Sequence, residues 1–259
     1  MARGSRKRFL EWPRVREAPS KRRIAIIPAL NEAATIGRVI GEIREADPGF
    51  EILVVDDGSD DGTGEIAEAA GARLLRLPFN LGIGGAVQTG YRYALRNGFE
   101  IAVQVDGDGQ HDPRQLPVIL EPLAAGEADI VIGSRFAGAG EYRATRGRRF
   151  GMVIFAGVVS MIVRQRLTDT SSSFRALNRR SLSLFAADYP HGFLETVEAT
   201  VLAGKYRLRM KEVPVTMRER ELGRSSLTIP LSLFYTAKVL LAVFVSLFRR
   251  PALRLEEEP

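Results

Sequence analysis

The sequence predicts an α/β fold: a doubly wound, mainly parallel sheet that carries its binding site at one edge. Short, almost continuously apolar runs rich in β-branched residues alternate with amphipathic helical patterns, as expected for strands buried on both faces. These runs end in polar and glycine-rich segments, which a parallel sheet brings together at the carboxyl ends of its strands. With 259 residues, 45% of them hydrophobic, the chain can form one large α/β domain.

The expected strands and helices alternate along the first half of the chain. The strand-like runs are residues 24–28, 51–57, 72–77, 101–106 and 129–134. The apolar residues of 36–43 share one face of a helix. Thr63 is expected to cap a second helix that Gly71 ends. In a third, Ala86, Gly90 and Ala94 form a stripe of small residues that lets the helix lie close to the sheet.

The pattern changes after residue 135. Residues 150–163 form an apolar helix that is too short to span a bilayer. Residues 168–180 are expected to be a polar loop, 193–203 a helix, and 205–217 alternate like a strand and its pair.

The C-terminal segment 229–250 is strongly apolar but has Lys238 in its middle. A central lysine costs about 2.5–3.5 kcal/mol on membrane-insertion scales, which a helix lying in the interface or docked on a partner avoids. A spanning helix and an ordinary core helix remain the alternatives. The sequence thus divides into a basic flexible arm (1–22), a main α/β domain that includes the apolar 150–163 helix (23–227), and a membrane-associated or partner-docking apolar helix with an acidic tail (228–259).

The net charge of +6 is concentrated in residues 1–23 and 143–149 and favours polyanionic partners. Nucleic acid is disfavoured because aromatic residues are not interleaved with the basic ones. Basic residues beside the apolar 150–163 helix suit a surface of anionic headgroups. The first 20 residues lack the apolar stretch of a signal peptide and are either a membrane-touching arm or a solvated tail. We expect a location at the cytoplasmic face of the membrane, either peripheral or through the single C-terminal apolar helix.

Two carboxylates follow the strand-like run at 101–106. Asp106 and Asp108 are two residues apart at a strand end, so both side chains enter the same crevice. Gln110 adds a neutral oxygen. The chain has no cysteine and two histidines, so a metal would be held by oxygen, which favours Mg²⁺ or Mn²⁺. A turn with capping aspartates is the structural alternative, and the convergence of the other strand ends weighs against it.

The neighbouring strand end carries Asp56 and Asp57, either of which could accept hydrogen bonds from a base edge or a ribose. Asp60 and Thr63, further along, are assigned to capping. The segment NLGIGG (80–85) opens a helix, so its free N–H groups could face a phosphate.

The motifs PALNEAATI, VVDDGSDDGT, NLGIGGAVQTGYRYA, VDGDGQHDP and VIGSRF, in this order, resemble those of the family 2 glycosyltransferases with the GT-A nucleotide-sugar fold. Within that family the chain looks most like the polyprenyl-phosphate (dolichyl-phosphate-type) sugar synthases. The shared segments are GSRF, RATRGRR, TDTSSSFRALNRR, GFLETVEATVLAG and VPVTMRERELGRSS. The resemblance covers about Ile24 to Leu227. It implies a metal-dependent inverting transfer from a UDP- or GDP-sugar to a polyprenyl phosphate.

The resemblance also implies roles for individual residues. The nucleotide-sugar site would contain Pro28, Ala29, Asn31, Glu32, Asp56, Asp57, Gly82 and Asp106. The metal ligands would be Asp106, Asp108 and Gln110. The catalytic set would be Asp106, Asp108, Arg135 and Arg220. The acceptor phosphate would meet Arg148, Arg149, Arg220 and Ser225. Two departures stand out: Ser226 replaces a common lysine, and TDTSSSFR replaces the commoner T-x-P/T-S-G-F-R.

Two acceptors remain open. A lipid phosphate is already anionic, so the metal and the arginines would do the electrostatic work without a strong base. A saccharide hydroxyl would need a base, for which Glu195 and Glu198 are the candidates. His111 is expected to orient Asp108, with a role as proton carrier as the alternative. A silent scaffold docking through 229–248 is disfavoured by the intact DGDGQ, and the apolar helices could pair in a homo-oligomer.

Overall fold

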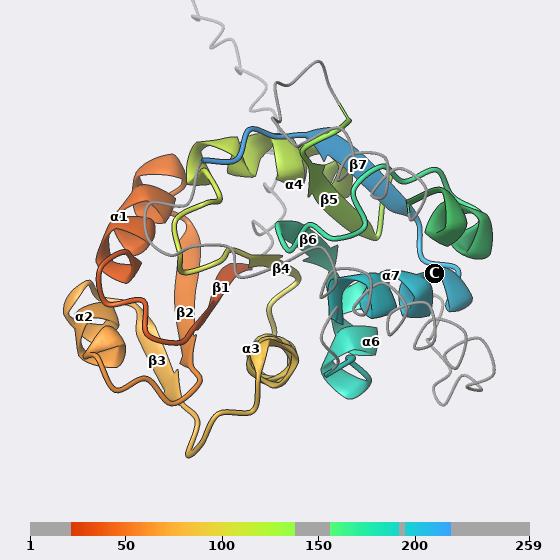
Figure 1. Cartoon of the computed structure of the whole chain (residues 1–259). Coiled ribbons are helices and arrows are strands. Elements are labelled where there is room, and N and C mark those ends of the chain that lie inside the picture. The colour runs from red at the N-terminus through yellow and green to blue at the C-terminus, as the bar shows by residue number, and fades with distance from the viewer. Residues whose placement is uncertain (1–21, 138–155, 192–194, 219–259) are drawn as a thin grey trace, which may run out of the picture.

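The computed structural model describes residues 22–137, 156–191 and 195–218 (Figure 1). They build a seven-stranded sheet with the order β3-β2-β1-β4-β6-β5-β7. The strands are β1 (Arg23–Ala29), β2 (Phe50–Asp56), β3 (Arg73–Arg76), β4 (Ile101–Gln104), β5 (Ile130–Ser134), β6 (Arg175–Asn178) and β7 (Met210–Pro214). β6 runs antiparallel to both its neighbours, β4 and β5, and the other neighbouring pairs are parallel.

Helices cover both faces of this sheet (Figure 1). They are α1 (Ile36–Ala46), α2 (Thr63–Ala69), α3 (Ile83–Arg96), α4 (Leu116–Ala124), α6 (Arg179–Ala187) and α7 (Glu195–Lys205), and residues 156–163 are helical as well. The apolar residues of α1, α2 and α4 share one core cluster. Those of α3, α6, α7 and 156–163 share the other. The predicted α/β architecture, with both faces of the sheet covered, is confirmed.

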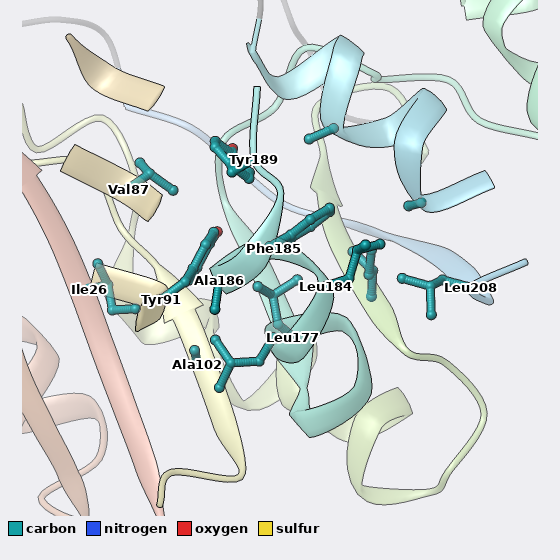
Figure 2. Packing of buried hydrophobic residues seen from close by; sticks show 14 of the residues in the cluster. Ile26, Val87, Tyr91, Ala102, Leu177, Leu184, Phe185, Ala186, Tyr189 and Leu208 are labelled. Atoms are coloured by element: carbon teal, nitrogen blue, oxygen red, sulfur yellow. The ribbon is translucent and has the colours of Figure 1, made fainter. Parts of the chain in front are cut away.

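The stripe of small residues on α3 has the consequence expected from the sequence. A Cβ atom at Gly90 would lie 2.3 Å from Cγ2 of Ile26 on β1, so the helix can approach the strand this closely only with glycine. Tyr91 follows and packs between the sheet and α6, with its ring centroid 6.0 Å from that of Phe185 and 5.5 Å from that of Tyr189 (Figure 2). This close contact fixes the middle of α3 against the sheet.

Two local predictions were wrong. Residues 168–180 are a loop only as far as Phe174, because β6 and then α6 follow, with Asn178 accepting a hydrogen bond from Ser181 N as the helix cap. A four-residue strand that contains an arginine has no clear alternation, so long-range pairing decides its structure. Thr63 does not cap α2: the cap is Gly62 in the left-handed region (φ 87°), and Thr63 is the first helical residue.

Within the described ranges, no helix combines the length and apolarity needed to cross a membrane. The second half of the predicted 150–163 helix is present, with Val159 and Val163 buried and Met161 74% exposed. Residues 1–21, the basic segment 143–149 and the apolar segment 229–250 lie outside the described residues, so the expectations about them and about the domain boundaries stay predictions.

Candidate active site

A cleft of about 390 Å³ lies at the carboxyl ends of β1, β2 and β4. It is lined by Pro28, Ala29, Leu30, Glu32, Asp57, Asn80, Gly82, Ile83, Ala86, Asp106, Gly107 and Asp108. Because these three strands are parallel neighbours, the loops that follow them meet at one edge of the sheet. The structure therefore brings together most of the residues expected around a nucleotide sugar, and both of the paired aspartates.

Asp57 joins two of the loops that form the cleft. Its Oδ1 atom accepts a hydrogen bond of 2.7 Å from the main-chain N–H of Leu81, at the entrance to α3. Its own N–H donates to the carbonyl of Ala29 at the end of β1 (2.9 Å). The side chain is buried, and it lines the cleft from a fixed position.

Asp56 and Asn31 stabilise the loops around the cleft. Asp56 accepts a hydrogen bond from Ser59 N (2.9 Å) and lies 3.8 Å from Nε of Arg76. Asn31, which has a positive φ of 56°, accepts from Asp60 N through its side chain and donates from its own N–H to Ser59 Oγ (both 3.0 Å). The geometry thus separates Asp57, which lines the cleft, from its neighbour Asp56, which shapes the turn.

The first turn of α3 borders the cleft. Gly82 caps the helix with a φ of 79°, and its N–H donates to Asn80 Oδ1 (2.8 Å). Gly82, Ile83 and Ala86 all line the cleft. The N-terminus of a 14-residue helix offers main-chain N–H groups and a positive dipole end to an anion. The segment NLGIGG (80–85), expected from the sequence to offer N–H groups to a phosphate, forms this N-terminus.

The two central aspartates are held by different partners. Asp106 Oδ2 accepts a hydrogen bond of 2.5 Å from Ser173 Oγ, and its Oδ1 lies 3.5 Å from Gln104 Nε2. Asp108 Oδ1 accepts from Gln110 N (3.0 Å), and its Oδ2 accepts from the Gln110 side-chain amide. Gln110 therefore orients Asp108 directly. Both carboxylates line the cleft, and the side chain of Asp106 is 29% exposed.

His111 contacts Asp106, so the expectation that it orients Asp108 was wrong. The N–H of Asp106 donates to His111 Nδ1 (3.0 Å), and His111 Nε2 lies 3.6 Å from Asp106 Oδ2. The imidazole is buried and stacks on Phe174, with 4.7 Å between ring centroids. Gly109 has a positive φ of 76°, in the turn that brings the His111 side chain back to the main chain of Asp106.

The donor set suits a hard divalent cation held together with a substrate. Among the described residues, no group of three or more His, Cys, Asp or Glu side chains is placed to hold a metal ion alone. Mg²⁺ commonly binds through one or two carboxylates and completes its shell with substrate phosphates and water. Asp106 and Asp108, lining one cleft beside a helix N-terminus, meet that requirement.

Comparison with known proteins assigns the fold to a family. Residues 24–185 match the model of glycosyl transferase family 2. The chain belongs to this family. This glycosyltransferase is 35% identical over 214 residues to an undecaprenyl-phosphate mannosyltransferase of Micrococcus luteus, covering 79% of this chain and 87% of that protein. It is 33% identical over 220 residues to a polyprenol monophosphomannose synthase of Mycolicibacterium smegmatis, covering 81% of this chain and 82% of that protein.

Solved structures of a glucosyl-3-phosphoglycerate synthase from Mycobacterium tuberculosis share the fold. Its complex with Mg²⁺ and UDP has a TM-score of 0.67 at 20% identity, covering 90% of this chain and 82% of that chain. Its complex with Mn²⁺, UDP and phosphoglyceric acid has a TM-score of 0.66 at 21% identity, covering 90% and 81%. At this identity the likeness establishes the GT-A-like mixed α/β fold of the glycosyltransferase, and nothing finer.

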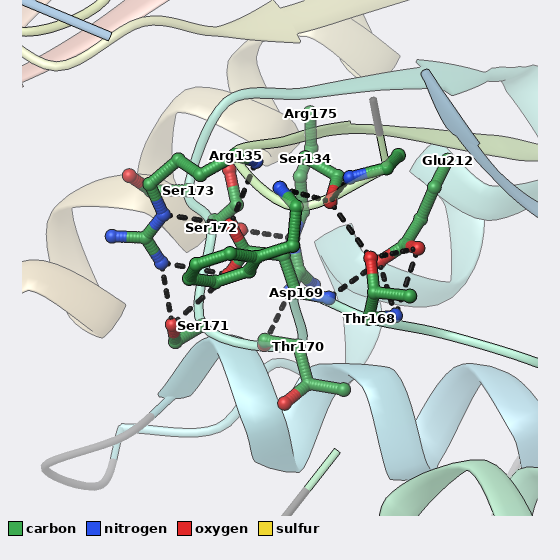
Figure 3. A network of polar contacts seen from close by, with 12 residues as sticks. Ser134, Arg135, Thr168, Asp169, Thr170, Ser171, Ser172, Ser173, Arg175 and Glu212 are labelled. Carbon is green, nitrogen blue, oxygen red and sulfur yellow. Dashed lines mark hydrogen bonds and ion pairs between the residues drawn. The ribbon is translucent and has the colours of Figure 1, made fainter. Parts of the chain in front are cut away.

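Arg135 follows β5 and is held by a buried carboxylate (Figure 3). Its Nε and one terminal nitrogen donate to the two oxygens of Asp169, each at 2.7 Å, and the same terminal nitrogen donates to Ser171 Oγ. Glu212 on β7 fixes the loop by accepting hydrogen bonds from the main-chain N–H groups of Thr168 and Asp169. This bidentate geometry orients the guanidinium of Arg135, whose side chain remains 17% exposed.

Sequence reasoning missed the buried polar residues behind the cleft. Arg175 on β6 is 1% exposed and donates to the carbonyls of Ser172 (2.7 Å) and Thr170 (3.0 Å). It stands opposite Gln104 in the sheet, so both side chains lie on one face. The arginine in FRALN, set among apolar residues, was the available signal. Ser173, which contacts Asp106, looked like one serine among three.

Glu195 begins α7 and is buried. Burial raises the pKa of its carboxyl to about 7, while the positive charge of Arg175 acts in the opposite direction and the negative charge of Asp106 adds to the rise. Glu198, one turn later, is half-buried. The two candidate bases thus differ in burial, and burial displaces the pKa of Glu195 toward neutrality.

Proposed function

We propose that this glycosyltransferase moves a sugar from a nucleoside-diphosphate sugar to a polyprenyl phosphate, with Mg²⁺ or Mn²⁺ and with inversion at the anomeric carbon. The observation that carries the proposal is the cleft in which Asp106 and Asp108 lie with Asp57 and the first turn of α3. The names of two relatives above 30% identity, both polyprenyl-phosphate mannose transferases, support the acceptor.

The cleft suits the two ends of such a donor. Leu30 and Ile83, 41% and 43% exposed, provide apolar surface for a base, and Asp57 and Asn80 provide polar groups for a base edge or ribose. The paired aspartates and the N-terminus of α3 suit the diphosphate and its cation. Both UDP- and GDP-sugars fit this description.

In the proposed reaction the protein mainly positions the donor, the cation and the acceptor phosphate. A cation held by Asp106 and Asp108 would neutralise the leaving diphosphate. The acceptor phosphate is anionic at neutral pH, so it can attack the anomeric carbon without a strong base, and direct displacement inverts the configuration. Arg135, oriented by Asp169, would add positive charge beside the phosphates.

The acceptor side of the proposal rests on residues outside the described ranges. Arg148, Arg149, Arg220 and Ser225 stay predictions for holding the lipid phosphate. The same applies to attachment at the cytoplasmic face of a membrane through 143–149 and 229–250, and to a homo-oligomer.

Glu195 favours a second candidate, transfer to a saccharide hydroxyl. A hydroxyl nucleophile needs a base, and a carboxylate with a pKa of about 7 is matched to that work at neutral pH. Glu195 begins α7, which packs on the face of the sheet opposite α1 and α4. It is close enough to Asp106 for the charge of that carboxylate to raise its pKa.

A transfer assay separates the two acceptors. Labelled UDP- and GDP-sugars are incubated with the full chain, Mn²⁺ and either a short polyprenyl phosphate or a saccharide, and label is followed into the organic phase. The proposal predicts organic-soluble label that Asp108→Ala removes and Glu195→Gln retains. Label that enters only the saccharide, and only when Glu195 is intact, would replace the lipid phosphate by the second candidate.

A further inference from the structure

Three hydrogen bonds form a closed ring around Asp106. The main-chain N–H of Asp106 donates to His111 Nδ1 at 3.0 Å. His111 Nε2 lies 3.4 Å from Ser173 Oγ, and Ser173 Oγ lies 2.5 Å from Asp106 Oδ2. The ring therefore starts at the backbone of Asp106 and returns to its carboxylate.

The first bond fixes the direction of the other two. Because Nδ1 accepts the Asp106 N–H, the neutral imidazole carries its proton on Nε2. That Nε2–H points to Ser173 Oγ, whose own proton is then left for the Asp106 carboxylate. Each group has a single role, and the serine hydroxyl both accepts and donates.

The ring is held rigidly by its surroundings. The His111 side chain is 3% exposed and lies parallel to the ring of Phe174, with 13° between the planes. The Phe174 carbonyl accepts a hydrogen bond from Gly133 N (2.8 Å), which ties the serine-bearing loop to β5. Ser173 thus reaches Asp106 from a loop that is far away in sequence but anchored to the same sheet.

We propose that Ser173 is a positioning residue for the cation site: its hydroxyl, directed by His111, locks Oδ2 of Asp106, while Oδ1, which lies 3.5 Å from Gln104 Nε2, keeps a lone pair for the cation. The inference rests on the proposed function. Asp106 lines the cleft with Asp108, so fixing its rotamer fixes one of the two carboxylates available to a cation.

The chain provides a matched control in the adjacent residue. Ser172 Oγ is buried and has no hydrogen-bond partner among the described residues, so Ser172→Ala removes a hydroxyl from the same loop without touching the ring. Ser173→Ala removes the bridging hydroxyl, and Ser173→Thr restores one. Thermal unfolding of each variant shows whether the fold is kept.

Two measurements test the proposal on the full chain without a lipid acceptor. Mn²⁺ affinity is measured by electron paramagnetic resonance in the presence of UDP or GDP. We expect Ser173→Ala to bind Mn²⁺ about 10–100-fold more weakly, with Ser173→Thr and Ser172→Ala like the wild type. The ¹⁵N spectrum of the two histidines is recorded in parallel, with His191→Asn as the assignment control, and should show His111 protonated on Nε2.

The outcomes separate this inference from the proposed function. Wild-type Mn²⁺ affinity in Ser173→Ala, or a His111 protonated on Nδ1, would overturn the positioning role. Ser173→Ala could bind Mn²⁺ more weakly while the wild type transfers no sugar to polyprenyl phosphate. That pair of results would support the positioning role and reject only the proposed acceptor. A wild-type protein that binds no Mn²⁺ with either nucleotide would overturn both.

Discussion

Residues 22–137 and residues 156–218 contribute to one sheet in different ways. In the first region, β1, β2 and β4 are parallel neighbours, and functional side chains directly follow the strands, as Asp57 and Asp106 do. In the second, β6 inserts antiparallel between β4 and β5, and its polar groups are buried behind the cleft. The first region presents its carboxylates to the cleft. The second uses its charges to hold the site together.

The comparison predicts two kinds of variant. A change to a cleft-lining carboxylate in the first region should abolish turnover while the fold stays intact. A change to a buried ionic group in the second should lower the free energy of unfolding before it changes the chemistry. The following predictions run from the largest expected effect to the smallest.

Asp108→Ala should reduce turnover about a thousand-fold or more. A cation that stabilises the leaving diphosphate contributes several kcal/mol, and about 4 kcal/mol corresponds to a factor of 10³. Initial rates with saturating nucleotide sugar and Mn²⁺ measure the loss, and the thermal midpoint should match that of the wild type. The control is Asp60→Ala, which removes an exposed carboxylate from a neighbouring loop. Turnover at the wild-type rate in Asp108→Ala would remove this aspartate from the site.

Asp169→Ala should lower the free energy of unfolding by about 3–5 kcal/mol, the usual cost of leaving one partner of a buried ion pair alone. Asp169 is fully buried and accepts two hydrogen bonds from the guanidinium of Arg135 and a third from its main-chain N–H. Urea unfolding measures the change. The control is Glu127→Ala, which breaks an exposed pair with Lys211 and should cost no more than about 1 kcal/mol. An equally small loss for Asp169→Ala would show that the Arg135–Asp169 pair does not stabilise the fold.

Glu195→Gln should change how stability depends on pH. The pKa of Glu195 is raised from 4.5 to about 7 in the folded chain, so between these values the native state binds more protons than the unfolded one. The free energy of unfolding therefore falls as pH rises through this window, by roughly 3 kcal/mol, and is level above it. Glu195→Gln should remove this decline and be the more stable protein at pH 8. Parallel pH profiles for the two proteins would contradict the burial of this carboxyl.

Asp57→Asn and Asp56→Asn should separate two adjacent carboxylates. Asp57 lines the cleft, so we expect its substitution to weaken nucleoside-diphosphate binding about tenfold, the effect of losing one charge-assisted hydrogen bond. Asp56 accepts from Ser59 N in the turn, so its substitution should lower stability by about 1 kcal/mol and leave the affinity unchanged. Fluorescence titration with a labelled nucleotide measures the affinity of both variants, and urea unfolding measures their stability. An equal loss of nucleotide affinity in both variants would contradict the separate roles of Asp57 in the cleft and Asp56 in the turn.

The sequence predicted the first region well because its signals are local. That Asp57, Asp106 and Asp108 meet in one cleft follows from the rule that neighbouring parallel strands end at the same edge of a sheet. In the second region β6 escaped prediction because it is four residues long and contains Arg175, and only its pairing with β4 and β5 makes it a strand. The contact of Ser173 with Asp106 escaped for the same reason, since 67 residues separate them.

The most direct test of the central claim, that the cleft holds a nucleoside diphosphate together with a divalent cation, is a calorimetric titration of UDP and of GDP. Each is titrated into the wild type and into Asp108→Ala, with and without Mn²⁺. We predict that one nucleotide binds more tightly with Mn²⁺ in the wild type, and that Asp108→Ala loses this dependence. Binding that is indifferent to Mn²⁺ in both proteins would contradict the assignment of Asp106 and Asp108 to a cation-assisted donor site.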